Sequence, residues 1–369
     1  MTVVIKNIEN TMDAAAFAYD MTKKYFSKLS TSARIIIKPN ITAPKLPCTG
    51  VTTHHEVLTG MLDALTGSKN IKVVESDATS SDFEQNIHGA GYSFLKDHPN
   101  VELINLSAEP TRKVTLQGYQ NTYDVELPEI LFEYDILINL PVMKTHILTV
   151  VSLGIKNLFG LLPCKNKSLY HIYIHDFLFA IFKRFQPHFT ILDGLVGMEG
   201  MGPIFGQPVN AKKILVSEDV VALDGIAAML MGFDPYQIPY LNFAIDYRFG
   251  DKNLSEIDIQ GDLEILNFKS ISTLPIQVIR TLLTRGGHLE HILEQIDAPL
   301  QTIKNLPIFI NSLISEGVIV KKNNGELHLN NANVDVLYSL FPEVKREFAD
   351  IILKSCFTEY NQLVSGENP

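Results

Sequence analysis

Lysine and histidine side chains gather in the middle of the chain, directly after an apolar run. The run Ile136–Leu140 predicts a buried strand, and the sequence KTH at 144–146 follows it. Lys156 then stands inside an apolar segment with Asn157 beside it, and His171 comes next. Ammonium groups bind carboxylates and phosphates, and an imidazole transfers protons near neutral pH. The stretch therefore predicts an anion-binding site with acid–base chemistry.

Each candidate residue can be given a role on this basis. We predict that the catalytic residues are Lys156, His146 and His171. The predicted substrate-binding residues are Lys38, Asn40, Thr53, Lys144, Asn157 and Glu199. The substrate would be a small carboxylate or phosphate, and an isomerase, racemase or other proton-transfer reaction is the leading hypothesis. The sequence predicts no metal ligands and leaves any cofactor unknown.

Lys156 has two interpretations. A lysine in an apolar helix either extends to the surface or meets an anion in the interior, because a buried unpaired charge is costly. Helical periodicity would place it on one face with Ser152 and Gly160, two small residues that leave room beside it. We favour the interior interpretation, and we expect Asp224, in another apolar helix, to face Lys156 or another cation.

The elements that must hold these residues alternate between strand and helix. Polar residues follow most of the predicted strands, which end near Lys38, Glu75, Asn139 and Asp193. Such alternation predicts a parallel sheet covered by helices, whose carboxyl edge is the usual ligand site. The predicted strands are Arg34–Lys38, Ile71–Val74, Val101–Leu106, Ile136–Leu140, Phe189–Leu192, Lys213–Val216 and Ile257–Ile259, with a hairpin at 112–124 and helices at 171–185 and 219–231.

Two neighbouring segments invite more specific interpretations. Thr53 and Glu56 would form a capping box at a helix start, whereas His54 and His55 point in different directions on a helix and cannot chelate a metal from one face. The glycine-rich stretch Gly194–Pro208 predicts a loop that is either a flexible connection or an approach to the ligand through Glu199.

The predicted fold class is α/β, with two Rossmann-like parallel-sheet halves and a small C-terminal winged-helix domain. The α/β domain would span 1–268, with halves of about 1–140 and 141–268, and the winged helix and a terminal helix would span 269–369. Three short helical pieces precede a hairpin whose turn, Asn323-Asn324-Gly325, favours type I′. Its recognition-like helix, 305–315, carries no basic side chain, so we expect packing or homo-oligomerisation through this region.

Composition narrows the function classes. With 369 residues, 46% hydrophobic content and a net charge of −10, the chain is unlike a nucleic-acid binder, which needs clustered Lys and Arg. No secretory signal or membrane-spanning segment is visible. Three separated cysteines predict reduced thiols in the cytoplasm and are too few for a four-cysteine iron–sulfur cluster within one chain.

The motifs from Ile37 to Gly250 resemble an uncharacterised family, domain of unknown function three-sixty-two. The shared motifs, in order, are KPN at 38–40, KTH at 144–146, IKNLFG at 155–160, His171, DGLVGMEGMGPIFGQP at 193–208 and SEDVVALDGIAAMLMGFDP at 217–235. The resemblance implies little chemistry, since the family's reaction is not established. Many members look like fusions to a ferredoxin module, whose cysteines this chain lacks.

A second resemblance concerns three residues. The order His146, Lys156 and His171 is similar to the His–Lys–His set of the nickel-pincer lactate racemase family, in which the lysine bears the cofactor and the histidines serve acid–base and metal roles. That family's glycine pattern is missing here. Two other functions stay open: a ligand-sensing regulator with a winged-helix output, and a redox protein with an acquired cofactor.

Overall fold

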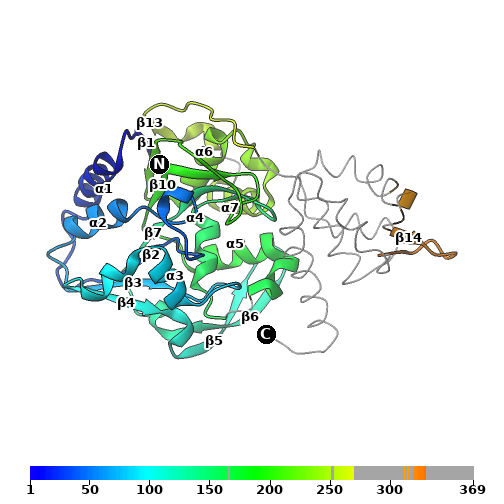
Figure 1. Ribbon diagram of the computed structural model, residues 1–369, viewed down its shortest axis with the longest axis horizontal. Helices are drawn as coiled ribbons and strands as arrows, with labels where there is room; N and C mark the ends of the chain where they lie inside the picture. The colour runs from blue at the N-terminus through cyan, green and yellow to red at the C-terminus, as the bar shows by residue number, and fades with distance from the viewer. Residues whose placement is uncertain are drawn as a thin grey trace.

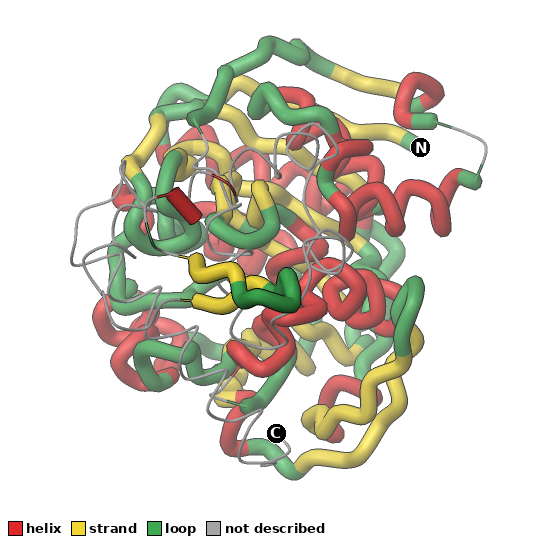
Figure 2. Tube along the Cα trace, turned by 90° about the vertical axis from the view of Figure 1, so that its right-hand side faces the viewer, coloured by secondary structure: helices red, strands yellow, loops and turns green. Residues whose placement is uncertain are grey.

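One large sheet with helices on both faces dominates the structure (Figures 1 and 2). The computed structural model describes residues 1–164, 167–250 and 253–269, then 311, 314–315, 317 and 319–329. Within these ranges the sheet has 11 strands. They are β1 (Thr2–Asn7), β2 (Arg34–Pro39), β3 (Asn70–Glu75), β4 (Val101–Asn105), β7 (Ile136–Leu140), β8 (Val142–His146), β9 (Val150–Ser152), β10 (Phe189–Glu199), β11 (Gln207–Val209), β12 (Lys213–Ser217) and β13 (Asp258–Gln260).

The sheet is mostly parallel, as predicted. Its order is β13-β1-β12-β10-β7-β2-β3-β4, and the run from β4 to β10 is parallel throughout. β12 runs antiparallel to both of its neighbours, β1 and β10, which the sequence did not indicate. Because β1 lies between β12 and β13, strands from both predicted halves belong to one sheet. The domain boundaries themselves stay a prediction.

The two faces of the sheet support separate cores. Along β2, Ile35 and Ile37 pack into one core and Ile36 into the other, as alternation along a strand requires. The first core contains residues of α1 (Thr11–Tyr25), α2 (His55–Ala64) and α3 (Phe83–Gly89). The second contains residues of α4 (Gly154–Asn157), α5 (Ile174–Arg184), α6 (Val220–Leu230) and α7 (Pro239–Phe249).

A hairpin stands apart from the main sheet and was predicted correctly. β5 (Thr111–Gln117) pairs antiparallel with β6 (Thr122–Pro128). Asp176 of α5 holds its tip by accepting hydrogen bonds from Gln120 N, from Asn121 N and Nδ2, and from the Tyr123 hydroxyl, at 2.6–3.1 Å. Through these bonds the hairpin is fixed to the second core.

The predicted C-terminal hairpin is also present. β14 (Ile319–Lys321) pairs with β15 (Leu327–Leu329), and Gly325 in the turn has φ of +88°. The helical pieces and the terminal helix predicted for 269–369 lie almost entirely outside the described residues, so the winged helix stays a prediction. In the part of the chain that is described, each helix is too short or too polar to cross a membrane.

Several predicted elements were wrong in detail. The supposed loop 194–208 contains the end of β10 and the start of β11. The helix predicted at 171–185 is a 3-10 segment, Lys167–Tyr173, followed by α5. Lys156 lies in the four-residue α4, not in a long helix, so the face shared with Ser152 does not exist: Ser152 belongs to β9. α2 begins after His54, and no side chain caps it, which excludes the predicted capping box.

Candidate anion-binding site

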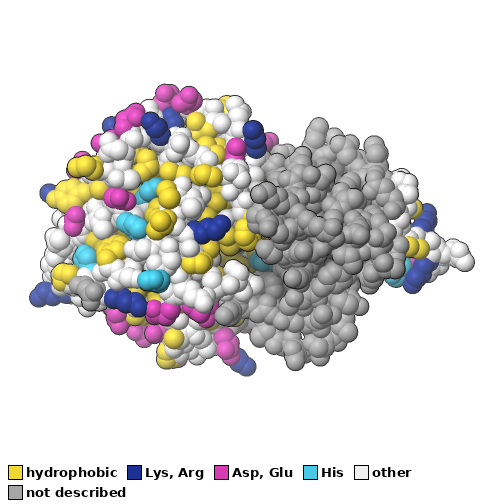
Figure 3. Space-filling model, viewed as in Figure 1, with side chains coloured by type: hydrophobic (Ala, Val, Ile, Leu, Met, Phe, Trp, Pro, Cys, Tyr) yellow, Lys and Arg dark blue, Asp and Glu magenta, His cyan; other side chains and the backbone are white. Residues whose placement is uncertain are grey.

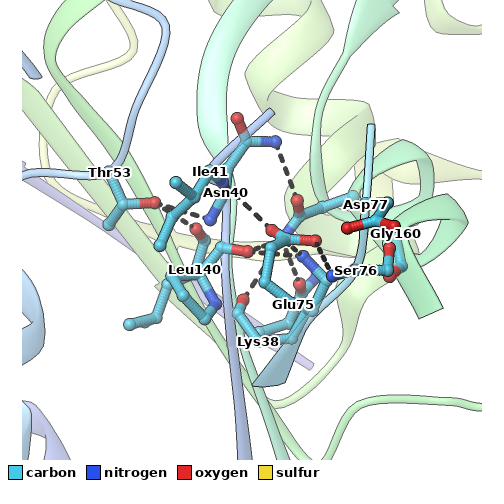
Figure 4. Close-up of polar contacts among 12 residues, drawn as sticks. Lys38, Asn40, Ile41, Thr53, Glu75, Ser76, Asp77, Leu140 and Gly160 are labelled. Carbon is cyan, nitrogen blue, oxygen red and sulfur yellow. Dashed lines mark hydrogen bonds and ion pairs between the residues drawn. The ribbon is translucent and has the colours of Figure 1, made fainter. Parts of the chain in front are cut away.

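The site begins where β2 and β3 end, with a buried ion pair. Lys38 Nζ lies 2.5 Å from Glu75 Oε2 and donates to the Pro39 carbonyl at 2.6 Å (Figure 4). Glu75 also accepts from Ile41 N and Ser76 N. Burial lowers the pKa of Lys38, and the Glu75 carboxylate partly offsets that effect. The charge of Lys38 is therefore balanced by Glu75.

Side-chain hydrogen bonds between three asparagines link Lys144 to the strand ends beside it. Lys144 Nζ, on β8, donates to Asn40 Oδ1 at 2.7 Å and to the Val51 carbonyl at 2.9 Å. Asn40 Nδ2 donates to Asn157 Oδ1 at 2.8 Å, and Asn157 Nδ2 donates to Asn139 Oδ1 at 2.8 Å. These hydrogen bonds fix the Lys144 ammonium in one orientation, with two of its three N–H groups in use.

Lys156 is buried without a polar partner in the described part of the chain. Its Nζ lies over the Phe159 ring, 4.3 Å from the centroid, and no hydrogen bond or ion pair to a described residue accompanies this contact. Burial lowers the pKa of Lys156 to about 7, and the charge of Lys167 acts in the same direction. Near neutral pH, this amine can therefore both accept and release a proton.

Lys167 completes the group and was not among the predicted site residues. Its Nζ donates to Ser76 Oγ at 2.5 Å, and Ser76 Oγ donates to the Gly160 carbonyl at 2.8 Å. Burial lowers the pKa of Lys167 to about 8. The signal was in the sequence, since Lys167 belongs to the same cation-rich stretch and Ser76 follows a predicted strand.

We call the four residues Lys38, Lys144, Lys156 and Lys167 the lysine cluster. Their exposed fractions are 1%, 0%, 9% and 7%, so all four residues are buried. Burial lowers the pKa of Lys144 to about 7, with Lys156 adding to the effect. Lys156 and Lys38 lower the pKa of Lys144, Lys167 lowers that of Lys156, and Lys38 lowers that of Lys167, which makes the cluster a single electrostatic unit.

His146 borders the cluster in a neutral form. Its Nδ1 accepts a hydrogen bond from Leu148 N at 3.0 Å, so the neutral ring carries its proton on Nε2. Burial holds the pKa of His146 well below its usual value, and nearby cations, Lys156 first, reinforce this. His146 thus presents an N–H donor. Opposite it in the β8–β9 register, Val150 has φ of +65°, a strained conformation for a β-branched residue.

The other predicted catalytic histidine is also near the cluster. His171 is half-buried, and its ring stacks on Phe159 with centroids 5.8 Å apart. Since Lys156 lies over the same Phe159 ring, two of the three predicted catalytic residues, Lys156 and His171, meet at this ring. The charge of His171 also acts on the pKa of His146.

Asp224 positions the helix that carries Lys156. Its two carboxylate oxygens accept from Gly154 N at 2.7 Å and Ile155 N at 2.8 Å, at the first residues of α4. The expected pairing of Asp224 with a lysine is therefore wrong: backbone N–H groups are its partners. Burial raises the pKa of Asp224 to about 7, against the lowering effect of these two hydrogen bonds.

Two further predicted substrate-binding residues, Thr53 and Glu199, make hydrogen bonds within the fold. The Thr53 hydroxyl accepts from Asn40 N and donates to the Leu140 carbonyl, which ties the loop before α2 to β7. Glu199 accepts from Lys269 N, and in the described ranges it makes no polar contact with the lysine cluster. Lys38, Asn40, Lys144 and Asn157, by contrast, do meet at the carboxyl edge.

A second buried pair lies nearby, on the α2 side of the sheet. His54 Nδ1 lies 2.8 Å from Asp193 Oδ2, and the same oxygen accepts from His54 N. Burial opposes a charge on this imidazole, but Asp193 and, to a smaller extent, Glu56 together outweigh burial, and the pKa of His54 is raised. Both residues stand out in the sequence, but nothing in their spacing indicates that they meet.

The lysine cluster is an interior feature. On the face in Figure 3, Lys and Arg side chains of the described residues lie singly among acidic and hydrophobic ones. Glu75 is paired with Lys38, and among the described residues the other three lysines of the cluster form no ion pair with a carboxylate. Such an arrangement can hold an anion through several N–H groups and can exchange a proton with it through Lys156.

The fold and this site together define a mostly parallel α/β protein with buried cationic residues at the carboxyl edge of its sheet. The chain belongs to the family described as Domain of unknown function (DUF362), which its residues 35–229 match. The family resemblance predicted from the sequence motifs is thereby confirmed. The match includes Lys38, Lys144, Lys156 and Lys167, and thus the whole lysine cluster.

Two further similarities were found. The chain is 26% identical over 217 residues to the thylakoid-associated protein sll1697 of Synechocystis sp., covering 56% of this chain and 65%, just under two thirds, of that protein. The lactate racemase apoprotein of Thermoanaerobacterium thermosaccharolyticum gives a TM-score of 0.42 at 11% identity, covering 62% of this chain and 57% of that one. At this level the structural likeness assigns neither a fold nor an activity.

Proposed function

We propose that the chain is an enzyme that binds a small carboxylate or phosphate at the lysine cluster and transfers a proton there, as an isomerase or racemase does. The observation that carries this proposal is Lys156, a buried amine without a polar partner among the described residues. Such a group is costly unless a ligand supplies the missing charge or accepts its hydrogen bonds. Its pKa of about 7 suits a residue that takes and returns a proton at neutral pH.

The neighbouring residues would divide the remaining work. Lys144, fixed by Asn40 and Val51, would hold the anionic group with its third N–H. His146 would donate a hydrogen bond from Nε2 to an oxygen that gains charge during the reaction, because its Nδ1 is occupied by Leu148 N. Proton transfer would then fall to Lys156, with His171 beside Phe159 as a second acid–base group.

Proton exchange with solvent tests the proposal before the substrate is identified. Small carboxylates and phosphate esters are incubated with the protein in D2O, and the loss of C–H signals is followed by NMR. We expect exchange with at least one compound, slowed by about 100-fold or more in Lys156→Met. The exposed Lys28→Met is the matched control and should exchange like the wild type. Equal rates in both variants would remove Lys156 from the mechanism.

A further inference from the structure

The hydrogen-bond inventory of the lysine cluster restricts the ligand further. Over the described residues, Lys144 has one N–H left, and Lys167, bonded only to Ser76, has two. Lys156 has all three. Three ammonium groups therefore offer donors to whatever occupies the site. Lys38, with hydrogen bonds to Glu75 and Pro39, also has one N–H left, but its charge is already neutralised by Glu75.

The charges around the lysine cluster also restrict the ligand, because the nearby carboxylates already have partners. Glu75 neutralises Lys38, and its remaining hydrogen bonds come from backbone N–H groups, of Ile41 and Ser76. The carboxylate of Asp77 accepts from Phe83 N, and Asp224 is committed to Gly154 and Ile155. In the described ranges, Lys144, Lys156 and Lys167 form no ion pair. A ligand with one negative charge would balance only one of these three cations.

We propose that the site is built for a dianion, either a phosphate monoester-like group or a dicarboxylate, held jointly by Lys144, Lys156 and Lys167. This inference rests on the proposed function and names its substrate class. A second negative charge is favourable here because buried charges interact strongly, and because it recruits the donors of Lys167 as well as those of Lys144. The Phe159 ring beneath Lys156 keeps that side of the ammonium free of competing acceptors.

Binding of the dianion is coupled to proton uptake. At pH 8 the amines of Lys144 and Lys156, with pKa values of about 7, are largely neutral, and that of Lys167, at about 8, is half charged. A dianion restores charge to more than one of them, whereas a monoanion restores one at most. Uptake of between one and two protons per bound ion is therefore expected for a dianion.

The test uses the whole chain and pairs of small anions that differ in charge. Sulfate is compared with nitrate, and malonate with acetate, by isothermal titration calorimetry at pH 8 in two buffers of different ionisation enthalpy. We expect each dianion to bind about 10-fold or more tightly than its monoanion partner, with uptake of more than one proton. Lys167→Met should remove most of this preference, and the exposed Lys28→Met should keep it.

The outcomes separate the two proposals. Equal binding of monoanions and dianions, both lost in Lys156→Met, would overturn the dianion and leave the proposed function standing. A preference for dianions that survives in Lys167→Met would overturn the joint site. If no anion binds and no compound exchanges in D2O, the proposed function itself fails. The comparison of anions needs only the wild type, so poor folding of a variant does not prevent it.

Discussion

Two buried polar regions of this protein are built on opposite principles. At the hairpin tip, the Asp176 carboxylate accepts four hydrogen bonds, from two backbone N–H groups, an amide and a phenol. In the lysine cluster, three buried ammonium groups keep donors unused among the described residues. A satisfied buried charge stabilises the fold, while an unsatisfied one costs stability. The difference separates a structural anchor from the proposed binding site.

The largest expected effect tests the anchor. Asp176→Ala leaves four donors of the hairpin tip without their acceptor, and we expect it to lower the free energy of unfolding by about 3 kcal/mol. The measurement is urea denaturation followed by circular dichroism. Asp124→Ala is the control, because this exposed hairpin carboxylate bonds, among the described residues, only to Thr115 Oγ1 and should change stability by less than about 0.5 kcal/mol. Similar losses in both variants would mean that Asp176 is no anchor.

The pH dependence of stability tests the other region. The pKa of Lys144 and of Lys156 is about 7 in the folded chain and near 10.5 when unfolded. Between these values the unfolded chain binds more protons, so stability rises with pH in this window. We expect each of these two lysines to contribute on the order of 2 kcal/mol to the gain in stability of the ligand-free protein between pH 7 and pH 9, and Lys156→Met to lose the Lys156 share.

His54 opposes this trend and must be separated from it. Its pKa is raised by Asp193, so its contribution is fully present below its unfolded pKa and is lost as the pH rises through the folded value. The difference between wild type and Lys156→Met at each pH cancels the His54 contribution. A difference that stays constant from pH 7 to pH 9 would show that Lys156 does not titrate there.

Local patterns predicted the parallel part of the fold and missed what depends on distant contacts. The run Ile35–Ile37 indicates a strand buried on both faces, and it is one. The glycines of 194–208 suggested a loop, yet Gly197 lies in β10, where a Cβ would come within 2.7 Å of the Met143 carbonyl. Glycine there permits close approach between strands rather than flexibility. Only the tertiary structure distinguishes these two uses.

The candidate site shows the same limit. Residue types and spacing brought out Lys38, Lys144, Lys156, His146 and His171, because polar residues at strand ends and a lysine in an apolar segment are visible locally. Whether each of these side chains has a hydrogen-bond partner depends on residues far away in the sequence. The hydrogen bond from Lys144 to Asn40 joins residues 104 positions apart, and the partners of Asp224 lie 69 and 70 positions away.

Packing against the Lys38–Glu75 pair gives the next effect in size. In Gly160→Ala, the new Cβ would lie 2.8 Å from Lys38 Nζ and 2.9 Å from Glu75 Oε1. We expect a loss of about 1.5 kcal/mol in stability and weaker anion binding, since Lys38 and Glu75 must shift beneath the site. Gly67→Ala is the matched control, because its Cβ meets nothing closer than 3.9 Å. If Gly160→Ala matched this control in urea denaturation, the pair would have room to adjust.

Asp224→Asn gives the smallest effect. It bears on the comparison between the two buried polar regions, because Asp224 accepts two hydrogen bonds and positions Lys156, whose donors are unused among the described residues. Its pKa is about 7 in the folded chain and near 3.8 when unfolded. Between these pKa values the folded chain binds more protons than the unfolded chain, so the wild type gains stability as the pH falls from 8 to 6. The side-chain amide of Asp224→Asn does not titrate, so the variant gains no stability from this position. We therefore expect the stability difference between the two proteins to shift by about 1 kcal/mol in favour of the wild type.

Urea denaturation of both proteins at pH 8 and pH 6 measures this shift, and every other titrating group cancels in the difference. At pH 8 the amide of the variant offers one oxygen to Gly154 N and Ile155 N, where the carboxylate offers two, which lowers stability. The amide also removes a buried charge, which raises stability. The free energies of unfolding of the two proteins should therefore lie within about 1 kcal/mol of each other. A difference that is the same at both pH values would mean that Asp224 keeps its charge throughout and holds α4 as a carboxylate. It would then be as fully satisfied as Asp176, and the cost of burial at this edge of the sheet would fall on the lysines alone.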